Sequence, residues 1–370
     1  MDIESTLSAL RESGNLRRVP ADSRASASID LSGNDYLGLA ERDDLRREFM
    51  AEACERGYAM SASASRLLAS HQHEFDALER CIAQAYARPA LLFNSGYHAN
   101  AGMIAALTAD KRPLVVADRL VHASIIDGIR LGGAPMERFR HNDYGHLRRI
   151  LSAKAKDYAG VLIVAESIYS MDGDRADIRE LVAAKEATPG AMLYIDEAHA
   201  VGALGPSGLG LAEAEGLGDR VDVLVGTIGK ALAGTGAYGV MSASMREFMV
   251  NKARSFIFST AMPPICAAWN RFIFERMQNM DSERRHLAAL SRTLYSALGL
   301  DAEPSHIAPL VVGTPGRAVA MSEALERKGY HVLPIRTPTV PPGTDRLRFS
   351  LSAAMDAGQI APLKQIIAEL

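Results

Sequence analysis

Cysteine is scarce in this chain: its 370 residues include only three, Cys54, Cys81 and Cys266, which lie far apart. An odd number of dispersed cysteines with no CxxC pair argues against a disulfide framework, so we expect a reduced, cytoplasmic setting. The first residues, MDIESTLSALRESG, also lack the basic start and apolar core of a secretory signal peptide.

Long apolar runs and an excess of charge of one sign are missing too. No apolar run reaches the roughly 18 residues that a membrane-spanning helix needs, so we expect no membrane span. The 41 Lys and Arg nearly balance the 44 Asp and Glu, for a net charge of −3. This balance gives no general reason to expect nucleic acid or a membrane surface as a partner. The length predicts one large domain and a smaller one.

Several common catalytic motifs are absent. No GxGxxG follows a predicted strand, and the chain contains neither a GxxxxGK[ST] phosphate loop nor a GxSxG elbow. His71 and His73 suggest a metal pair, but positions i and i+2 do not share a helix face. We therefore expect no metal site.

The middle of the chain alternates short apolar runs with helical patterns. The predicted strands are ALLF (90–93), PLVVAD (113–118), GVLIVAES (160–167), AMLYIDEA (191–198), VDVLVGT (221–227) and AYGVMSA (237–243). Runs such as VLIV and VLV are continuously apolar, which is typical of strands covered on both faces. Helical patterns at 101–109 and 144–155 lie between them, so the sequence predicts a doubly wound α/β domain with a largely parallel sheet.

The pattern changes after about residue 262. The sequence then predicts, in order, helices over 263–280 and 283–298, a strand over 306–313, a helix over 316–329, strands over 331–335 and 345–353, and a final helix. We therefore predict three parts: an N-terminal helix and arm (1–40), a large α/β domain (41–262) and a small α+β domain (263–370).

Polar residues follow most of the predicted strands where each strand ends, which is where ligands bind in sheets of this kind. They are Asn94 to Tyr97, His122, the stretch SIYSMDGD (167–174), Asp196 with His199, and Thr227 with Lys230. Taken singly, each has a structural explanation. Asp196 could cap a helix, Asp172-Gly173 could form a turn, and His122 could be structural.

Lys230 differs from the other seven lysines, which lie in polar or helical contexts. It is the one charged residue of GTIGKALAGTGAYG (226–239), among five glycines that offer little surface for a lysine stem. The combination of these residues indicates pyridoxal phosphate. It consists of a lysine, an aspartate and a histidine at strand ends, and of small residues at a helix start, where an anion can bind. The lysine forms a Schiff base with the aldehyde, and the aspartate keeps the pyridine nitrogen protonated.

Ordered motifs along nearly the whole chain resemble the α-oxoamine synthases, which are pyridoxal-phosphate enzymes of fold type I. The matching stretches are NDYLGLA (34–40), LLFNSGYHAN (91–100), ADRLVHASIIDG (117–128), RFRHND (138–143), ESIYSMDGD (166–174), IDEAHAVGALGPSGLG (195–210), GTIGKALAGTGAYG (226–239), FIFSTAMPP (256–264) and PTVPPGTDRLRFSLSA (338–353). The resemblance implies a fold-type-I transferase with a large, mostly parallel sheet domain and a small α+β C-terminal domain.

The resemblance implies a catalytic set and a cofactor site. Lys230 would hold the cofactor and transfer the proton, Asp196 would pair with the ring nitrogen, and His122 would stack on the ring. The other implied cofactor-binding residues are His199 and Ser170 at the ring hydroxyl, and Gly96, Tyr97 and Thr227 at the phosphate. Ser259 and Thr260 would reach the phosphate of a neighbouring subunit, which implies a homodimer with shared active sites.

The resemblance also implies the substrates. Arg348 would bind the amino-acid carboxylate close to Asn34, and Arg17 and Thr339 would border the acyl group. The stretches 338–348 and 138–143 are most similar to family members of biotin synthesis. Those enzymes join L-alanine to a pimeloyl thioester, carried by CoA or an acyl carrier protein, with loss of CO2. This acyltransferase reaction is the predicted activity.

Two alternatives remain open. One is another α-oxoamine synthase, such as a glycine C-acetyltransferase, that uses glycine or serine with a different thioester. The other is a non-catalytic subunit that binds pyridoxal phosphate or a partner chain. Such a subunit usually lacks the lysine, whereas this chain has Lys230.

Overall fold

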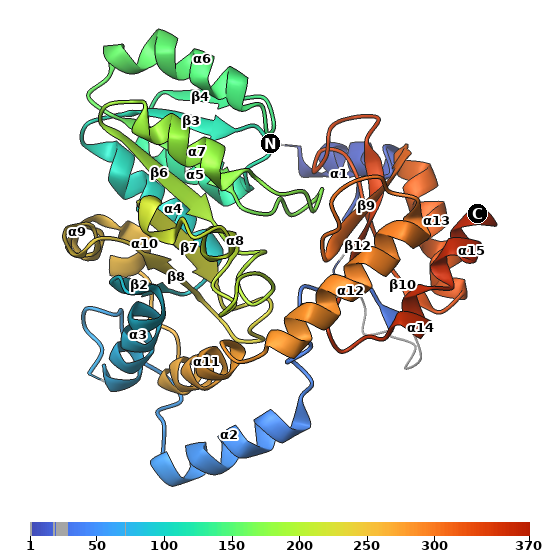
Figure 1. The fold of residues 1–370 in the computed structure, drawn as a ribbon, viewed down its shortest axis with the longest axis horizontal. Helices are drawn as coiled ribbons and strands as arrows, with labels where there is room; N and C mark the ends of the chain where they lie inside the picture. The colour runs from blue at the N-terminus through green and yellow to red at the C-terminus, as the bar shows by residue number, and fades with distance from the viewer. Residues whose placement is uncertain (1, 18, 20–28, 71) are drawn as a thin grey trace. The chain divides into compact units, whose positions relative to one another are not determined.

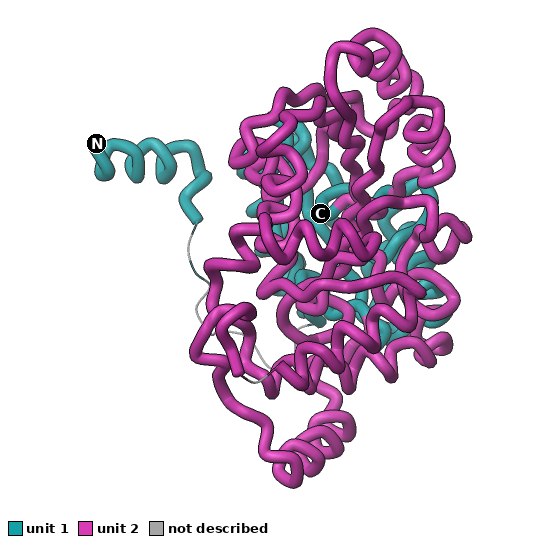
Figure 2. Tube along the Cα trace, turned by 90° about the vertical axis from the view of Figure 1, so that its left-hand side faces the viewer, with its two compact units in different colours: residues 1–36, 170–174, 285–370 teal, residues 37–169, 175–284 magenta. Residues whose placement is uncertain are grey.

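The computed structural model describes residues 2–17, 19, 29–70 and 72–370, and it divides into two compact units (Figure 1, Figure 2). Unit 1 comprises Met1–Tyr36, Ser170–Asp174 and Arg285–Leu370, and unit 2 comprises Leu37–Tyr169 and Arg175–Arg284. Each unit therefore combines segments that are far apart in the sequence. Residues 18 and 20–28 of the predicted arm lie outside the described residues.

Unit 2 contains a seven-stranded sheet. In the order β2-β8-β7-β6-β5-β3-β4, its strands are β2 (Ala90–Phe93), β8 (Ala237–Val240), β7 (Val223–Thr227), β6 (Ala191–Asp196), β5 (Val161–Glu166), β3 (Leu114–Asp118) and β4 (Met136–Phe139). Only β8 runs antiparallel to its neighbours. The largely parallel sheet and all six predicted strands are thus confirmed. The seventh strand, β4, was missed because its sequence MERF has only short apolar content and lies at the sheet edge.

Helices α3, α4, α6 and α7 pack against strands of the sheet of unit 2. The helices of this unit are α2 (Asp43–Arg56), α3 (His73–Tyr86), α4 (Gly96–Ala109), α5 (Ala123–Gly132), α6 (Tyr144–Lys154), α7 (Ile178–Glu186), α8 (Leu211–Ala214), α9 (Ala243–Lys252), α10 (Arg254–Ile257) and α11 (Pro264–Met277), with 3-10 turns at Ala155–Asp157 and Gly218–Arg220. Every residue of β5 and β7 is buried, as the continuous apolar runs predict for strands covered on both faces.

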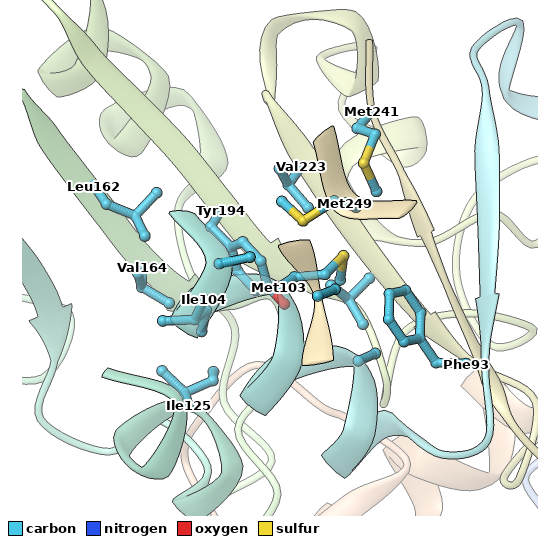
Figure 3. Packing of buried hydrophobic residues seen from close by; sticks show 14 of the residues in the cluster. Phe93, Met103, Ile104, Ile125, Leu162, Val164, Tyr194, Val223, Met241 and Met249 are labelled. Atoms are coloured by element: carbon cyan, nitrogen blue, oxygen red, sulfur yellow. The ribbon is translucent and has the colours of Figure 1, made fainter. Parts of the chain in front are cut away.

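The core of unit 2 is centred on α4. This helix contacts α5 and the strands β7 and β8, and its side chains Met103 and Ile104 are fully buried. Figure 3 shows them packed with Ile125 of α5 and with Val164 and Val223 of the sheet. The position of α4 is therefore fixed by apolar contacts along most of its length.

Unit 1 holds two small sheets. In one, β12 (Asp345–Ser350) lies between β9 (Ile307–Gly313) and β11 (Leu333–Ile335), all antiparallel, and in the other, β1 (Ile29–Asp30) pairs in parallel with β10 (Tyr330–His331). The helices are α1 (Ile3–Glu12), α13 (Pro315–Arg327), α14 (Ala357–Ile360) and α15 (Leu363–Ala368), and α12 (Asp281–Leu298) crosses the boundary at residue 285. The predicted α+β character of this part is confirmed.

Two details of unit 1 differ from the prediction. The run 331–335, predicted as one strand, is divided because its start pairs with β1 and its end pairs with β12. The final helix is interrupted at Pro362, which lacks the N–H that a continuous helix would need there.

The unit boundaries also fall at other places than the predicted residues 40 and 262. Helix α11 belongs to unit 2, where Trp269 Nε1 donates to Ala233 O at 3.1 Å and Asn270 Nδ2 to Thr235 O at 2.7 Å. The loop Ser170–Asp174 belongs to unit 1, since Arg346 of β12 pairs with Asp172. Gly173, at φ +71°, also lies so close to Ile307 O that a Cβ would stand only 2.0 Å away.

The sheet of unit 2 brings distant residues to one edge. Because β2 is antiparallel to β8 and β8 to β7, the strand β2 runs in the same direction as the five parallel strands. The carboxyl ends of β2, β3, β5, β6 and β7 therefore lie at the same edge, and the residues that follow each strand come close together.

Candidate active site

The carboxylate of Asp196 ends β6 and is buried. Its Oδ1 accepts the backbone N–H of Ala198 at 2.8 Å, and its Oδ2 accepts the side-chain amide of Asn100 at 2.7 Å. Glu166 lies beside it in register at the end of β5 and is buried too. Burial, together with the nearby Asp196 charge, raises the pKa of Glu166 well above its ordinary value. Two buried carboxyl groups side by side disfavour a second negative charge, and burial together with the Asp196 charge favours the proton on Glu166.

Lys230 lies in the bend that follows β7, and its Nζ is 2.8 Å from Nε2 of His199. His199 is buried in the turn after the neighbouring strand β6. The two side chains, 31 residues apart in sequence, meet because their strands are adjacent in the sheet. This amine is half-buried next to an imidazole, and partial desolvation favours the neutral, nucleophilic amine that forms a Schiff base.

His122 is the N-cap of α5. Its backbone N–H donates to the Glu166 carboxyl group, and its Nδ1 lies 2.7 Å from Ser124 Oγ. Burial and the charge of Lys230 lower the pKa of His122, although Asp196 and Asp127 act in the opposite direction. The imidazole is therefore favoured in its neutral form.

The N-terminus of α4 offers an anion site. Ser95 caps the helix by accepting the N–H of His98 at 3.2 Å, and the helix begins at Gly96 and Tyr97. The first N–H groups of a helix have no intrahelical acceptor, and they favour a bound anion. Thr227 Oγ1 would lie 3.8 Å from a Cβ on Gly96, so its hydroxyl is adjacent to these groups. The Tyr97 side chain is exposed and donates to Asp127, so only the backbone N–H of Tyr97 contributes to this anion site.

Ser259 and Thr260 follow α10. Ser259 lines a small cavity with Asn94, whose amide donates to Thr260 O. Thr260 also forms a bridge with Ser65 and is exposed. Their predicted contact with the phosphate of a neighbouring subunit stays a prediction.

These groups of unit 2 fit pyridoxal phosphate. The helix start at Gly96 with Thr227 suits a phosphate, the buried Asp196 suits a protonated ring nitrogen, and Lys230 suits the aldehyde. The structure brings Lys230 to His199 and Gly96 to Thr227. Ser170, predicted to act with His199, belongs to unit 1 instead, and its contact with the cofactor stays a prediction.

Unit 1 contains a buried arginine with unusual partners. Arg348 of β12 donates from Nε to Ser170 O at 2.6 Å and from Nη2 to Asn34 Oδ1 at 2.9 Å. Tyr36 donates to the same Asn34 oxygen at 2.9 Å. Burial raises the pKa of Tyr36 to about 12, so its phenol remains a donor. The predicted neighbours Arg348 and Asn34 are thus hydrogen-bonded.

Arg346 provides a direct contrast on the same strand. It is as buried as Arg348, but it forms an ion pair with Asp172. Within the described part of the chain, no carboxylate lies within 4.0 Å of Arg348. A buried cation without a counter-ion is costly, so Arg348 fits the carboxylate of a ligand.

The two remaining predicted residues also meet. Arg17 donates from Nη2 to Thr339 Oγ1 at 2.8 Å, and both are exposed. Their predicted place beside the acyl group stays a prediction. His71 of the rejected metal pair lies outside the described residues, among which no group of three or more side chains suited to metal binding occurs. None of the helices described combines the length and apolarity of a membrane span.

Three residues of this region were not singled out from the sequence. Asn100, Ser124 and Glu166 are buried and contact Asp196, His122 or both. The sequence does contain a signal for Asn100, which is an amide in a mostly apolar helix, one turn after Gly96.

Comparison with known proteins gives matches over nearly the whole chain. The profile of the family "Aminotransferase class I and II" matches residues 26–367. An 8-amino-7-oxononanoate synthase of Chlorobaculum parvum is 47% identical over 352 residues, which are 92% of this chain and 89% of that protein.

Solved structures show the same fold. A serine palmitoyltransferase from S. paucimobilis with bound PLP and myriocin has a TM-score of 0.88 at 29% identity, over 99% of this chain and 96% of its own. An 8-amino-7-oxononanoate synthase from Francisella tularensis has a TM-score of 0.77 at 26% identity, over 93% of this chain and 97% of its own. The predicted fold type I is confirmed.

Proposed function

The chain belongs to the aminotransferase class I and II family, and on this premise we propose that it is the acyltransferase of biotin synthesis that forms 8-amino-7-oxononanoate. L-Alanine and a pimeloyl thioester are the substrates, with pyridoxal phosphate as cofactor. The α-carbon of alanine forms a bond to the thioester carbonyl, whose C–S bond breaks to release the thiol. The alanine carboxyl group leaves as CO2. The relative of Chlorobaculum parvum bears the name of this activity.

The observation that carries the proposal is the juxtaposition of Lys230 with His199 beside the buried Asp196. When bound, pyridoxal phosphate supplies an aldehyde for covalent attachment and a ring that accepts the electron pair released at the substrate α-carbon. Lys230 would hold the cofactor through its amine and would then remove and return the α-proton of the substrate. Asp196 supplies the negative charge for the ring nitrogen, and His199 orients the lysine amine.

The other cofactor contacts follow from the helix start of α4. The N–H groups of Gly96 and Tyr97 and the hydroxyl of Thr227 would hold the phosphate, and His122 would cover one face of the ring. Ser170 would contact the ring hydroxyl. We assign Ser259 and Thr260 to the phosphate of a second subunit, so the enzyme would be a homodimer in the cytoplasm.

Substrate binding is assigned to unit 1. Arg348 binds the alanine carboxylate through its guanidinium fork, next to Asn34, because its charge is not used by a protein carboxylate among the described residues. Arg17 and Thr339 border the acyl group. CoA and an acyl carrier protein are both suitable thiol carriers for this chemistry.

The test is thiol release by the purified, cofactor-loaded protein. Pimeloyl-CoA is offered with L-alanine, glycine or serine, and palmitoyl-CoA is offered with serine, because the chain also resembles a serine palmitoyltransferase. We expect release with alanine and pimeloyl-CoA, and 8-amino-7-oxononanoate by mass spectrometry. Release with serine or glycine alone would assign another activity of this family. No release with any pair, including pimeloyl on a carrier protein, would refute the proposal.

A further inference from the structure

Asn100 of α4 lies at the centre of a buried hydrogen-bond network. Its Nδ2 donates to Asp196 Oδ2 at 2.7 Å and to Ser124 Oγ at 3.0 Å, and its Oδ1 accepts the Tyr194 hydroxyl at 2.7 Å. All four residues are at most 5% exposed. The network joins the helices α4 and α5 to the strand β6.

The orientation of the Asn100 amide is determined by its partners. A carboxylate can only accept, so the amide nitrogen must face Asp196. Burial raises the pKa of Tyr194 well above its ordinary value, so the phenol keeps its proton and donates to the amide oxygen. Figure 3 shows Tyr194 among the apolar side chains beside α4, where a second orientation would leave buried polar atoms unpaired.

The same logic fixes the proton on His122. The backbone N–H of Ser124 donates to His122 Nδ1 at 3.3 Å, and a backbone N–H cannot accept. This long contact favours a lone pair on Nδ1, and Ser124 Oγ, 2.7 Å away, donates its hydrogen to the same atom. The serine oxygen is then left to accept the amide of Asn100. In the neutral imidazole, these contacts together favour the ring proton on Nε2.

Charged groups face His122 from several elements. Asp196 of β6 and Asp127 of α5 favour its protonated form, whereas burial and Lys230 favour the neutral form and prevail. Glu166 of β5 accepts its backbone N–H. The start of α5 also disfavours a positive imidazole, because the helix dipole is positive there.

We infer that Asn100 is a positioning residue of the active site, which holds the Asp196 carboxylate in one orientation and, through Ser124, holds His122 as the neutral tautomer protonated on Nε2. The inference rests on the proposed function. Because Gly96 and Asn100 are one turn apart, a single helix would then position both the phosphate site and the partner of the ring nitrogen.

The first test uses nitrogen NMR of the histidine rings in cofactor-free protein, with His122 identified by its loss in His122→Gln. Wild type should show one neutral tautomer of His122 with the proton on Nε2. In Asn100→Leu, an apolar side chain with the same branching replaces the amide. Ser124 Oγ is then free to accept from Nδ1–H, and only the long 3.3 Å contact of the Ser124 backbone N–H still opposes that tautomer. We expect the minor tautomer to increase about 10-fold and His122 to protonate at higher pH, because the network loses one hydrogen bond.

The second test uses the loaded enzyme and follows exchange of the alanine α-proton with deuterated water. Asn100→Leu should lower the rate constant about 10- to 100-fold, from loss of a hydrogen bond to a charged group, with the KM for alanine unchanged. Ser124→Ala should change the His122 signals but affect exchange less, because Asn100 still holds Asp196. It also serves as the test if Asn100→Leu does not fold.

Asn270→Ala is the matched control. Asn270 is a fully buried asparagine of α11 in the same unit, and its amide bonds to the backbone of Thr235. Its loss should lower stability but leave the His122 signals unchanged. Unchanged His122 signals and exchange in Asn100→Leu would overturn the inference while leaving the proposed function intact. Failure of wild type to form product would refute the function, and the cofactor-free spectra would still decide the state of His122.

Discussion

The polar groups of the two units are prepared for their ligands in different ways. In unit 2 the Asp196 carboxylate accepts two hydrogen bonds from the protein, and Asn100 uses both ends of its amide. In unit 1 the buried Arg348 donates to a carbonyl and an amide oxygen and forms no ion pair among the described residues, whereas Arg346 on the same strand pairs with Asp172.

Each arrangement suits a different kind of ligand. A network with its partners already in place suits a cofactor that stays bound through many turnovers, because little reorganisation accompanies each reaction. A buried cation without a protein counter-ion suits a substrate that arrives and leaves, because the ligand itself supplies the missing charge. Damage to unit 2 should therefore impair chemistry, and damage to Arg348 should impair binding.

The largest effect is expected from Lys230→Ala in unit 2. Without the amine, the cofactor has no covalent attachment and the α-proton has no base, so turnover should fall by several orders of magnitude. Borohydride reduction followed by mass spectrometry measures the attachment directly. Lys252→Ala removes an exposed lysine of α9 and should change neither quantity. Turnover at the wild-type rate in Lys230→Ala would contradict the assignment.

The next largest effect is expected from Arg348→Lys in unit 1. Lysine keeps the charge but lacks the guanidinium fork, so the KM for L-alanine should rise about 10- to 100-fold with a smaller change in kcat. Arg346→Lys keeps a cation beside Asp172 and should leave the KM for alanine unchanged. Steady-state kinetics with varied alanine distinguishes the two variants. Equal effects of both would show that the contrast between these arginines has no role in binding.

Much of unit 2 could be predicted from the sequence because its signals are local. Continuous apolar runs identified six strands, and the residues directly after them included Asp196, His122 and Lys230. Since parallel strands end at one edge, this local pattern already predicts a shared site. The strand β4 was not predicted because an edge strand needs few apolar residues and its sequence therefore lacks the apolar pattern.

The rest depends on which elements pack together, which a sequence pattern does not contain. The link between Asn100 and Ser124 exists only because α4 and α5 lie against each other. The allocation of Ser170–Asp174 to unit 1 depends on Arg346, 174 residues away from its partner. Likewise, α11 has the pattern of any long helix, and only its contacts with the loop after Lys230 place it in unit 2.

Replacing Glu166 in unit 2 should have a moderate effect on stability, and the size of this effect should depend on pH. Its folded pKa lies above the ordinary value of 4.5, so above that pH the folded state keeps a proton that the unfolded state has lost. Stability is therefore lost as pH rises through this window, by at most about 1.4 kcal/mol per pH unit. Glu166→Gln cannot titrate, so it should gain stability relative to wild type as pH rises, measured by thermal denaturation from about pH 5 to 8.

Replacing Glu186 should change stability with the opposite dependence on pH. This exposed carboxylate of α7 pairs with Arg220, which lowers its pKa. Its contribution is present above the unfolded pKa and is lost as pH falls, so Glu186→Gln should lose stability relative to wild type mainly at higher pH. Parallel stability curves for Glu166→Gln and wild type would show that Glu166 is charged in the folded protein.

The smallest effect is expected at Gly128, where α5 meets α4. A Cβ there would lie 3.0 Å from Asn100 O and 3.1 Å from Ile104 Cβ, so Gly128→Ala should force the helices apart by a few tenths of an ångström. Overpacking outweighs the better helix propensity of alanine, for a net loss of about 1 kcal/mol in thermal or urea unfolding. Gly316→Ala in α13 of unit 1 meets no atom within 4 Å and should instead be neutral or stabilising.

Gly128→Ala also tests the hydrogen-bond network through the His122 spectrum, in addition to the small loss of stability. The 3.0 Å hydrogen bond from Asn100 to Ser124 crosses the interface that this substitution widens. If the network of unit 2 is as rigid as its hydrogen bonds indicate, the His122 spectrum should move part of the way toward that of Asn100→Leu. A loss of stability with an unchanged His122 spectrum would mean that side chains adjust to the new spacing, and that the network tolerates more movement than its geometry indicates.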